Sequence, residues 1–361
     1  MGRKILKISL HDFEARKHEV GKQVVEACRD TGFFLLSDHG VPDADIDEAF
    51  AQAKRALDLP GKTKKKYPFS LDRYVGWRGL DELSSVTGNR LWEQWLVNRY
   101  GVGGYDAREN DFIGDIWPQE LGDSYKDFVI SFQEKTHAVL LKLLRAIALG
   151  LGWEEHFFDE AFDITSEQNP SILAVNYYPP LTEEEVKQKQ PPRLHGHADM
   201  DMLTILYQRP GDTGLEIAPG NDAQNAEHLI ADPGNIWNSM PDVHEWTPLD
   251  PVKGCVTVNI GDGLARWTDG LLKSTYHRVR APRADDNRGP RYSIPYFANS
   301  KLDVVIQGPN KKFDPVTSFD LLSKTGESYD GKKNKPGNEW QKKAYLQAYD
   351  REVAAEIVTV A

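Results

Sequence analysis

Hydrophobic positions recur with helical spacing in three segments of the first half of the chain. Residues 11–32, 43–60 and 124–152 carry apolar residues three and four positions apart, which predicts three helices. The third segment is so rich in apolar residues that we expect most of its circumference to be covered, as in a helix that backs a sheet. Two shorter apolar runs, residues 4–10 and 33–42, predict strands.

The second half of the chain has a different pattern. Between residues 171 and 299, short runs rich in β-branched and aromatic residues alternate with turn signals. This rhythm predicts an α+β, mainly β fold with a jelly-roll or barrel core that the preceding helices cover on one face. The Asp-Gly pair in WTDGLL, residues 267–272, predicts a two-residue hairpin turn that leads the next strand towards the core. The runs are SILAVNYYPP, DMLTILYQ, TGLEIAP, EWTPLD, CVTVNIG, LLKSTYHRVRA and RYSIPYFAN.

We expect a single integrated unit with three parts. Residues 1–165 form an N-terminal helical and mixed region, residues 166–306 form the jelly-roll core, and residues 307–361 form an extension that ends in a helix. Residues 220–244 interrupt the strands as a long polar excursion, and loops of that length are usually functional or disordered.

Composition narrows the class of protein. The formal net charge of -11 over 361 residues argues against extended binding of nucleic acid, which needs a clustered basic surface. The single basic run, residues 61–68, is short and is expected to be a solvated helix end or loop. Two distant cysteines and the lack of a long apolar run predict a cytoplasmic protein without a membrane span. No feature indicates an obligate protein partner.

The segment LHGHADMDMLTILYQ, residues 194–208, concentrates the candidate chemistry. Two histidines and two aspartates precede an apolar strand, and three interpretations compete: a metal site, a general acid/base pair or an exposed polar turn. On a strand, His197 and Asp199 project in the same direction. His277 from a neighbouring strand would complete a 2-His-1-carboxylate triad, whose open positions suit iron(II). A lone His-x-Asp also occurs by chance in many proteins.

Five segments share their order and approximate spacing with one family: NYYPP (176–180), HADMDMLTILYQ (197–208), NIGD (259–262), LLKSTYHRV (271–279) and RYS (291–293). With them the chain resembles the isopenicillin N synthase-like iron(II) and 2-oxoglutarate-dependent oxygenases. RDTGFFLLSDHGVP, residues 29–42, is similar to the helical leader of the same family. The resemblance extends over residues 5–306 and implies a double-stranded β-helix, that is, a jelly-roll core.

The resemblance implies a role for each matching residue. His197, Asp199 and His277 become the iron ligands. Arg291 and Ser293 match an Arg-x-Ser pair that holds a distal carboxylate, which agrees with the bidentate affinity of guanidinium for carboxylate. The residues that approach the other end of the cosubstrate are Asn176 and Tyr178.

Substrate contacts are expected from the region between residues 74 and 95 and from the excursion at residues 220–244. Tyr74, Trp77 and Arg78 are the candidates there, whereas Trp92 and Trp95 are expected to lie in the core. The aromatic and arginine content of the region indicates a flat or carboxylated small molecule as substrate.

The sequence departs from the family pattern in three places. The stretch of residues 220–244 lengthens the separation of the first and last ligands. The loop before Arg291 is long, so that nearby arginines are alternatives for its role: Arg280, Arg283 and Arg288. His195 forms a His-x-His pair with His197, which would suit a cupin-like site, but the apolar run after Asp199 favours His197 as the ligand.

The resemblance implies a non-haem iron(II) dioxygenase that uses 2-oxoglutarate and O2 and releases succinate and CO2. Its reaction would be hydroxylation, desaturation or cyclisation at an unactivated C–H bond of a small, specialised metabolite. One alternative is an oxidase of the isopenicillin N synthase type, in which the Arg-x-Ser pair holds a carboxylate of the substrate itself. A second alternative is a binding or scaffold module, against which the intact ligand set argues, because unused buried charges are costly.

Overall fold

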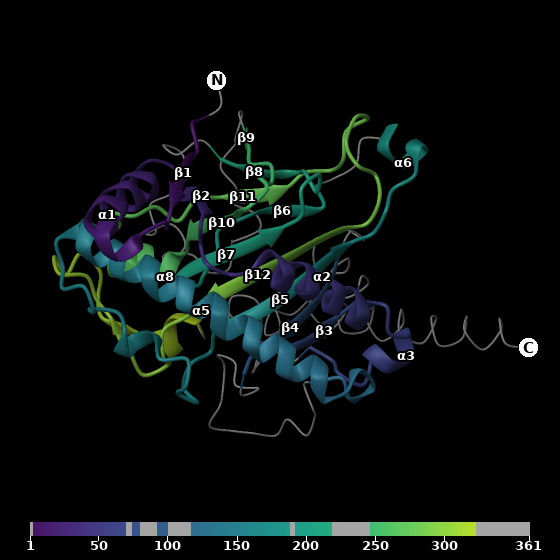
Figure 1. Ribbon diagram of the computed structural model, residues 1–361, viewed down its shortest axis with the longest axis horizontal. Helices are drawn as coiled ribbons and strands as arrows, with labels where there is room; N and C mark the ends of the chain where they lie inside the picture. Colours follow the sequence, from purple (N-terminus) through teal and green to yellow (C-terminus); the bar gives the residue numbers. More distant parts are fainter. Residues whose placement is uncertain are drawn as a thin grey trace, which may run out of the picture.

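The computed structural model describes residues 3–69, 74–79, 92–99, 117–187, 192–218 and 246–322. Two β-sheets lie beside each other, and helices cover one face of the larger sheet (Figure 1). The polar excursion at residues 220–244 and the expected C-terminal helix lie outside the described residues.

The large sheet has the order β1-β2-β10-β7-β12-β5-β4-β3. β1 and β2 pair in parallel, and the other neighbours pair antiparallel. The N-terminal region therefore contributes strands to both edges of the sheet that contains the core strands. In chain order the strands of this sheet are β1 (Leu6–Ser9), β2 (Phe33–Ser37), β3 (Gly76–Arg78), β4 (Glu93–Val97), β5 (Ile172–Tyr178), β7 (Leu203–Gln208), β10 (Cys255–Ile260) and β12 (Arg291–Ala298).

The small sheet has the order β6-β11-β8-β9 and is antiparallel. Its strands are β6 (Leu194–His197), β8 (Leu215–Ile217), β9 (Thr247–Pro248) and β11 (His277–Val279). A further two-stranded pair consists of β13 (Val305–Ile306) and β14 (Val316–Thr317). Two facing sheets are consistent with the expected jelly-roll core.

Helices form the remaining layer. The long helix α5 runs along the large sheet and contacts β7 and β12, while α1 and α2 contact α5 (Figure 1). Among the described helices, none has both the length and the apolar character to cross a bilayer. The helices are α1 (Phe13–Asp30), α2 (Asp43–Leu57), α3 (Gly61–Lys64), α5 (Asp123–Leu151), α6 (Glu183–Lys187) and α8 (Asp262–Trp267), with 3₁₀ turns η1 (Gln119–Leu121) and η2 (Glu160–Phe162).

The main core lies between α5 and the large sheet. Tyr207 and Tyr296 point from the sheet towards α5, where their hydroxyl oxygens lie 2.9 Å from Thr136 Oγ1 and His137 Nδ1. Both tyrosines are buried, so these hydrogen bonds satisfy polar atoms that water does not reach. The apolar pattern of residues 124–152 is thus explained by one helix that packs on a sheet and on α1.

Successive side chains of a strand point to opposite faces of the sheet. The residues between those that face α5 therefore form the other face of the large sheet. Thr204 and Gln208 on β7 point away from α5, because Tyr207 points towards it. Asn259 lies directly across from Thr204, and Ser293 directly across from Gln208. This second face, turned towards β6 and β11, is called the inner face below.

The strands and the three long helices expected from the hydrophobic pattern are confirmed, but one local expectation was wrong. WTDGLL is not a hairpin turn: Asp269 and Gly270 have φ of 54° and 76° and end helix α8, and the Gly270 amide donates to Ala265 O. The reason is that residues 262–267 form a helix, so no strand enters the turn.

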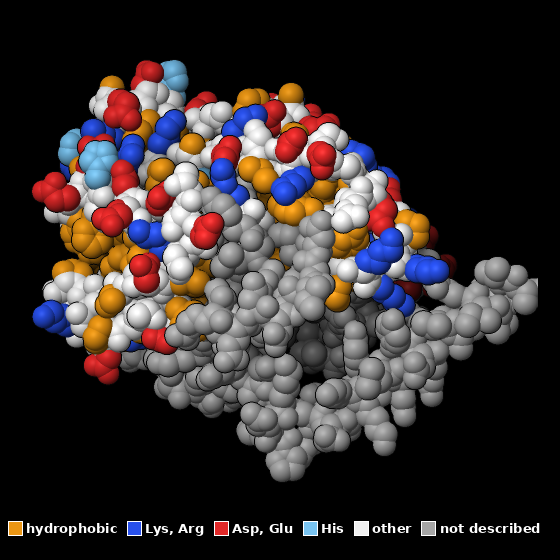
Figure 2. Space-filling view, turned by 90° about the horizontal axis from the view of Figure 1, so that it is seen from below, with side chains coloured by type: hydrophobic (Ala, Val, Ile, Leu, Met, Phe, Trp, Pro, Cys, Tyr) orange, Lys and Arg blue, Asp and Glu red, His pale blue; other side chains and the backbone are white. Residues whose placement is uncertain are grey.

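The basic run at residues 61–68 is only partly solvated. Lys62 and Lys66 are exposed, but Lys64 is buried and donates to Glu93 Oε1 at 2.6 Å. Elsewhere the described surface in Figure 2 mixes acidic and basic side chains, with one group of lysines and arginines at the right-hand end, where α3 lies in Figure 1.

Candidate metal centre

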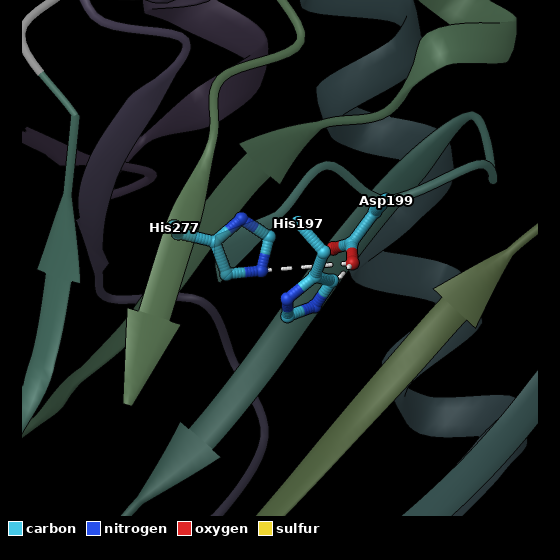
Figure 3. Close-up of side chains that lie close together, drawn as sticks. All are labelled: His197, Asp199 and His277. Carbon is cyan, nitrogen blue, oxygen red and sulfur yellow. Dashed lines mark ion pairs between the residues drawn. The ribbon is translucent and has the colours of Figure 1, made fainter. Parts of the chain in front are cut away.

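His197 and His277 face each other across two neighbouring strands. They are direct Cα partners in the antiparallel pair of β6 and β11, and Asp199 follows two residues after β6. Their ring centroids are 4.3 Å apart. Figure 3 shows all three side chains turned towards one point.

The distances at this point exclude ordinary hydrogen bonds and fit neighbouring metal ligands. Asp199 Oδ1 lies 3.6 Å from His197 Nε2 and 3.6 Å from His277 Nε2. The three candidate ligand atoms lie within 4.8 Å of one another, so that a single ion can contact them all. The structure therefore brings together the three residues that the sequence assigned to one triad.

His277 is held in the tautomer that a metal ligand requires. Its Nδ1 lies 3.1 Å from the carbonyl oxygen of Thr275, which can only accept a hydrogen bond. Nδ1 therefore carries the proton, and Nε2 keeps its lone pair for the point shared with Asp199. A backbone carbonyl that fixes the ring in this way is a common outer partner of metal-binding histidines.

Asp199 is oriented by two side chains of the inner face. Asn259 Nδ2 donates to Asp199 Oδ2 at 2.8 Å, and Thr204 Oγ1 lies 2.7 Å from the same oxygen. These contacts leave Oδ1 turned towards the imidazoles. Burial acts to raise the pKa of Asp199, but the imidazoles of His277 and His197 and the two hydrogen bonds hold it below its ordinary value.

A second buried carboxylate shares the Thr204 hydroxyl. Asp201 Oδ2 lies 2.9 Å from Thr204 Oγ1, which has one proton for two carboxylates. Burial, together with the charge of Asp199, raises the pKa of Asp201 well above its ordinary value. The sequence pattern showed Asp201 but did not reveal Thr204, whose hydroxyl links the two aspartates across a loop.

The donor set fits iron(II). Two imidazole nitrogens and one carboxylate oxygen form the mixed N/O triad typical of non-haem iron(II) oxygenases. The triad comes from one side only, from β6, β11 and the loop after β6, so the protein leaves further coordination positions to other ligands.

The four residues predicted for cosubstrate binding are paired across β5 and β12. Asn176 lies directly opposite Ser293, and Tyr178 directly opposite Arg291. Residues paired in this way share a face, and Ser293 belongs to the inner face. Asn176 Nδ2 lies 3.5 Å from Ser293 Oγ, and the Arg291 guanidinium lies 5.0 Å from the centre of the Tyr178 ring.

Arg291 is almost completely buried, and the described residues satisfy only part of its guanidinium. Its Nε donates to the carbonyl oxygens of Asp212 and Thr213 at 3.3 and 3.1 Å. Its Nη1 is buried without a hydrogen-bond partner among the described residues. An orphaned buried donor of this kind is explained by an anionic ligand that is not part of the chain.

A row of polar side chains continues across the inner face. Gln94 on β4 is paired with Asn176 and donates to its Oδ1 at 3.0 Å, and Arg78 on β3 is paired with Gln94. All three are buried. Gln94 was missed in the sequence, because only the strand register reveals that it supports Asn176.

The predicted substrate residues are divided between the two faces of the sheet. Arg78 is on the inner face, its guanidinium 3.5 Å from the ring centre of Phe69, which in turn contacts the ring of Tyr74. Trp77 is paired with Trp95 on the helix side and donates to Glu93 Oε1. The structure thus brings Arg78 and Tyr74 to the inner face and does not bring Trp77 there, because alternation turns its ring the other way.

The residues considered as alternatives have other surroundings. Arg280 is bound to Asp286, while the more exposed Arg283 and Arg288 lie near Glu216 and Glu183. None of the three is paired with Tyr178 across the sheet, as Arg291 is. Trp92 and Trp95 are buried, as expected for core residues. The side chain of His195 is outside the described part of the chain.

Comparisons with known proteins point to one family. Residues 169–300 match the 2OG-Fe(II) oxygenase superfamily, and residues 5–120 match the N-terminal region described as that of a non-haem dioxygenase in morphine synthesis. The first match contains all three triad residues as well as Asn176 and Arg291. Together the two matches span most of the chain before residue 300.

Individual relatives agree with these matches. The chain is 28% identical to the 2-oxoglutarate-dependent dioxygenase traH of Penicillium crustosum, over 82% of this chain and 84% of the relative. It is 27% identical to gibberellin 20 oxidase 1 of Arabidopsis thaliana, over 83% and 70%. The fold is similar to that of a Neurospora crassa protein solved in complex with alpha-KG and 5-formyluracil, with a TM-score of 0.73, 24% identity and coverage of 90% and 96%. The chain therefore belongs to the 2OG-Fe(II) oxygenase superfamily and is a 2-oxoglutarate- and iron(II)-dependent dioxygenase that uses O2.

Proposed function

We propose that the protein oxidises an unactivated C–H bond of a small, specialised metabolite, by hydroxylation, desaturation or ring closure, with release of succinate and CO2. The observation that carries the proposal is the convergence of His197, Asp199 and His277, with Asp199 hydrogen-bonded to the inner face on which the buried Arg291 also lies. A metal triad alone would suit many proteins. A triad beside a buried, incompletely paired guanidinium suits an enzyme whose cosubstrate is an acid.

In this proposal His197 Nε2, Asp199 Oδ1 and His277 Nε2 hold iron(II). When bound, the metal supplies the redox chemistry that couples oxidation of 2-oxoglutarate by O2 to oxidation of the substrate. Thr275 keeps the lone pair of His277 Nε2 available through its hydrogen bond to Nδ1. Asn259 and Thr204 keep Asp199 Oδ2 occupied, so that Asp199 offers one oxygen to the metal.

The cosubstrate is oriented by the residues paired across β5 and β12. Arg291 binds the distal carboxylate of 2-oxoglutarate, and Ser293 adds a hydroxyl two positions further along the same face. Asn176 and Tyr178 line the path between that carboxylate and the metal. Gln94 holds Asn176 Oδ1 and so turns the Asn176 amide nitrogen towards Ser293.

The substrate contacts the part of the inner face beyond Asn176, near Arg78 and Tyr74. The guanidinium of Arg78, stacked on Phe69, would favour a carboxylated or flat aromatic molecule. Support for a small molecule comes from relatives named gibberellin 20 oxidases. We also propose that residues 1–165 and 166–306 act as one catalytic unit, supported by the shared large sheet, and that the enzyme works in the cytoplasm.

The proposal is tested by measuring succinate from anaerobically prepared Fe(II) protein supplied with O2 and 2-oxoglutarate, with and without each member of a metabolite panel. We expect at least one carboxylated or aromatic compound to stimulate succinate formation and to be recovered with a changed mass. The relative traH is named as a 2-oxoglutarate-dependent dioxygenase, so the oxidase alternative is not favoured. Oxidation of a compound at the same rate without 2-oxoglutarate would instead support the oxidase alternative.

A further inference from the structure

A small polar pocket lies beside Arg291 and contains a second buried arginine. Arg193 lies directly before β6 and is 3% exposed, and Arg291 is also 3% exposed. Both line the pocket, together with residues of the loops at 211–213 and 280–289. Arg193 Nη2 donates to the carbonyl oxygen of Pro179, so this side chain bridges from β6 to the end of β5.

Among the described residues, the charges that line the pocket do not balance. Arg280 is paired with Asp286, and Asp212 accepts a hydrogen bond from Arg209 Nε at 3.1 Å. Arg193 and Arg291 remain, and neither forms an ion pair with a carboxylate in the described parts of the chain. Two buried guanidinium groups therefore share one pocket in which no carboxylate of the described residues forms an ion pair with either of them.

Burial opposes the positive charge of both side chains, and the charge of Arg291 adds to this effect at Arg193. Burial and the neighbouring charge of Arg291 lower the pKa of Arg193 to about 10. Burial also lowers the pKa of Arg291. Arginine stays charged under ordinary conditions, so both groups remain cations at neutral pH. A fold that keeps two such cations together, with Arg291 Nη1 unpartnered, is stabilised when an anion lies between them.

We propose that Arg193 is a further cosubstrate-binding residue and that it holds the distal carboxylate of 2-oxoglutarate together with Arg291. This inference rests on the proposed function, which assigns that carboxylate to Arg291. A carboxylate accepts several hydrogen bonds at once, so two guanidinium groups can share it. Arg193 immediately precedes the strand that ends in His197, so the same strand would connect the carboxylate pocket to the metal.

The proposal predicts that Arg193 recognises the distal carboxylate and no other part of the cosubstrate. The direct probe is calorimetric binding of 2-oxoglutarate to Mn(II)-loaded protein, because this measures affinity without turnover. A comparison ligand, 2-oxopentanoate, keeps the 2-oxo acid and the chain length but ends in a methyl group. Arg193→Met should weaken 2-oxoglutarate binding by about 10- to 100-fold, the loss expected for charge-assisted hydrogen bonds. Binding of 2-oxopentanoate should change less than about twofold, because it makes no such hydrogen bonds.

Two further variants keep the test clear. Arg193→Lys retains the charge but loses the fork geometry, so its affinity for 2-oxoglutarate should lie between those of the wild type and Arg193→Met, even if the methionine variant folds poorly. Arg283→Met removes an arginine of the neighbouring loop, whose side chain is 66% exposed, and should leave 2-oxoglutarate affinity unchanged.

Three results would overturn the proposal: an unchanged affinity for 2-oxoglutarate in both Arg193 variants, an equal loss for the two ligands, or an equal loss in Arg283→Met. Failure of the proposed function gives a different result, because the wild-type Mn(II) protein would then bind 2-oxoglutarate no better than 2-oxopentanoate.

Discussion

Thr204 Oγ1 lies 2.7 Å from Asp199 Oδ2 and thereby links a strand of the large sheet to a ligand that follows a strand of the small sheet. Because Asn259 contacts the same oxygen at 2.8 Å, two strands of the large sheet together set the direction of Asp199 Oδ1. The orientation of the Asp199 carboxylate thus depends on contacts between the two sheets.

Replacing Thr204 should weaken the metal centre without removing a ligand. Thr204→Val keeps the shape but leaves the Asp199 and Asp201 carboxylates without the hydroxyl between them. We expect the affinity for Fe(II) or Mn(II) to fall by about 10- to 100-fold and the free energy of unfolding to fall by about 1–3 kcal/mol. Chelator competition and thermal denaturation measure the two effects. Thr257→Val, on neighbouring β10, is the matched control and should keep metal affinity; equal affinities in the two variants would contradict the assignment.

Asp199 and His195 distinguish two possible ligand sets. Asp199→Ala should abolish metal-dependent turnover and leave the far-UV circular dichroism unchanged, because one side-chain ligand is lost and no strand is broken. His195→Ala should retain substantial activity. Succinate formation measures both. If the His195 variant is inactive and the Asp199 variant active, the site uses a His-x-His pair of the cupin type.

His137 should make the fold sensitive to moderate acid. Burial lowers the pKa of His137 from its ordinary 6.5 to about 4, so the unfolded chain takes up a proton at a higher pH than the folded one. Stability is therefore fully present above pH 6.5 and is lost as the pH falls towards 4, by ~3 kcal/mol for this residue. Chemical denaturation across this range should show a shallower loss in His137→Gln. Identical slopes in the two proteins would show that other groups cause the acid sensitivity.

The close packing of α1 and α5 depends on glycine. A Cβ added at Gly150 would lie 2.3 Å from the carbonyl oxygen of Gly21, a backbone atom that cannot move aside. Gly150→Ala should therefore be destabilising, because overpacking by about 1–3 kcal/mol outweighs the gain in helix propensity of about 1 kcal/mol. Gly61→Ala in α3, with open space around it, should be neutral or stabilising. Melting temperatures test the pair, and equal shifts would argue against the contact.

The sequence predicted those parts of the site that follow from local pattern. His197 and Asp199 were recognised from the alternation of a strand, and Arg291 and Ser293 from the same spacing, supported by the resemblance to the family. Contacts that depend on strand register could not be predicted, because one sequence does not show which strands are neighbours. Gln94 beside Asn176 is an example.

Arg193 was missed for a different reason. It stands at the start of the alternating pattern Arg-x-His-x-His-x-Asp, residues 193–199, and so continues the spacing of the ligands. Histidine and aspartate are sufficient for a metal site, so this pattern alone does not indicate a role for Arg193. The Asp-Gly turn of residues 269–270 was misassigned because a turn signal does not reveal whether a strand or a helix precedes it.

The central claim is that His197, Asp199 and His277 bind one iron(II) ion. The most direct measurement is an anomalous difference map at the iron absorption edge, from crystals grown anaerobically with Fe(II) and 2-oxoglutarate. The account predicts one strong peak in contact with His197 Nε2, Asp199 Oδ1 and His277 Nε2. A peak that contacts other side chains, or no peak in crystals shown to contain iron, would contradict it.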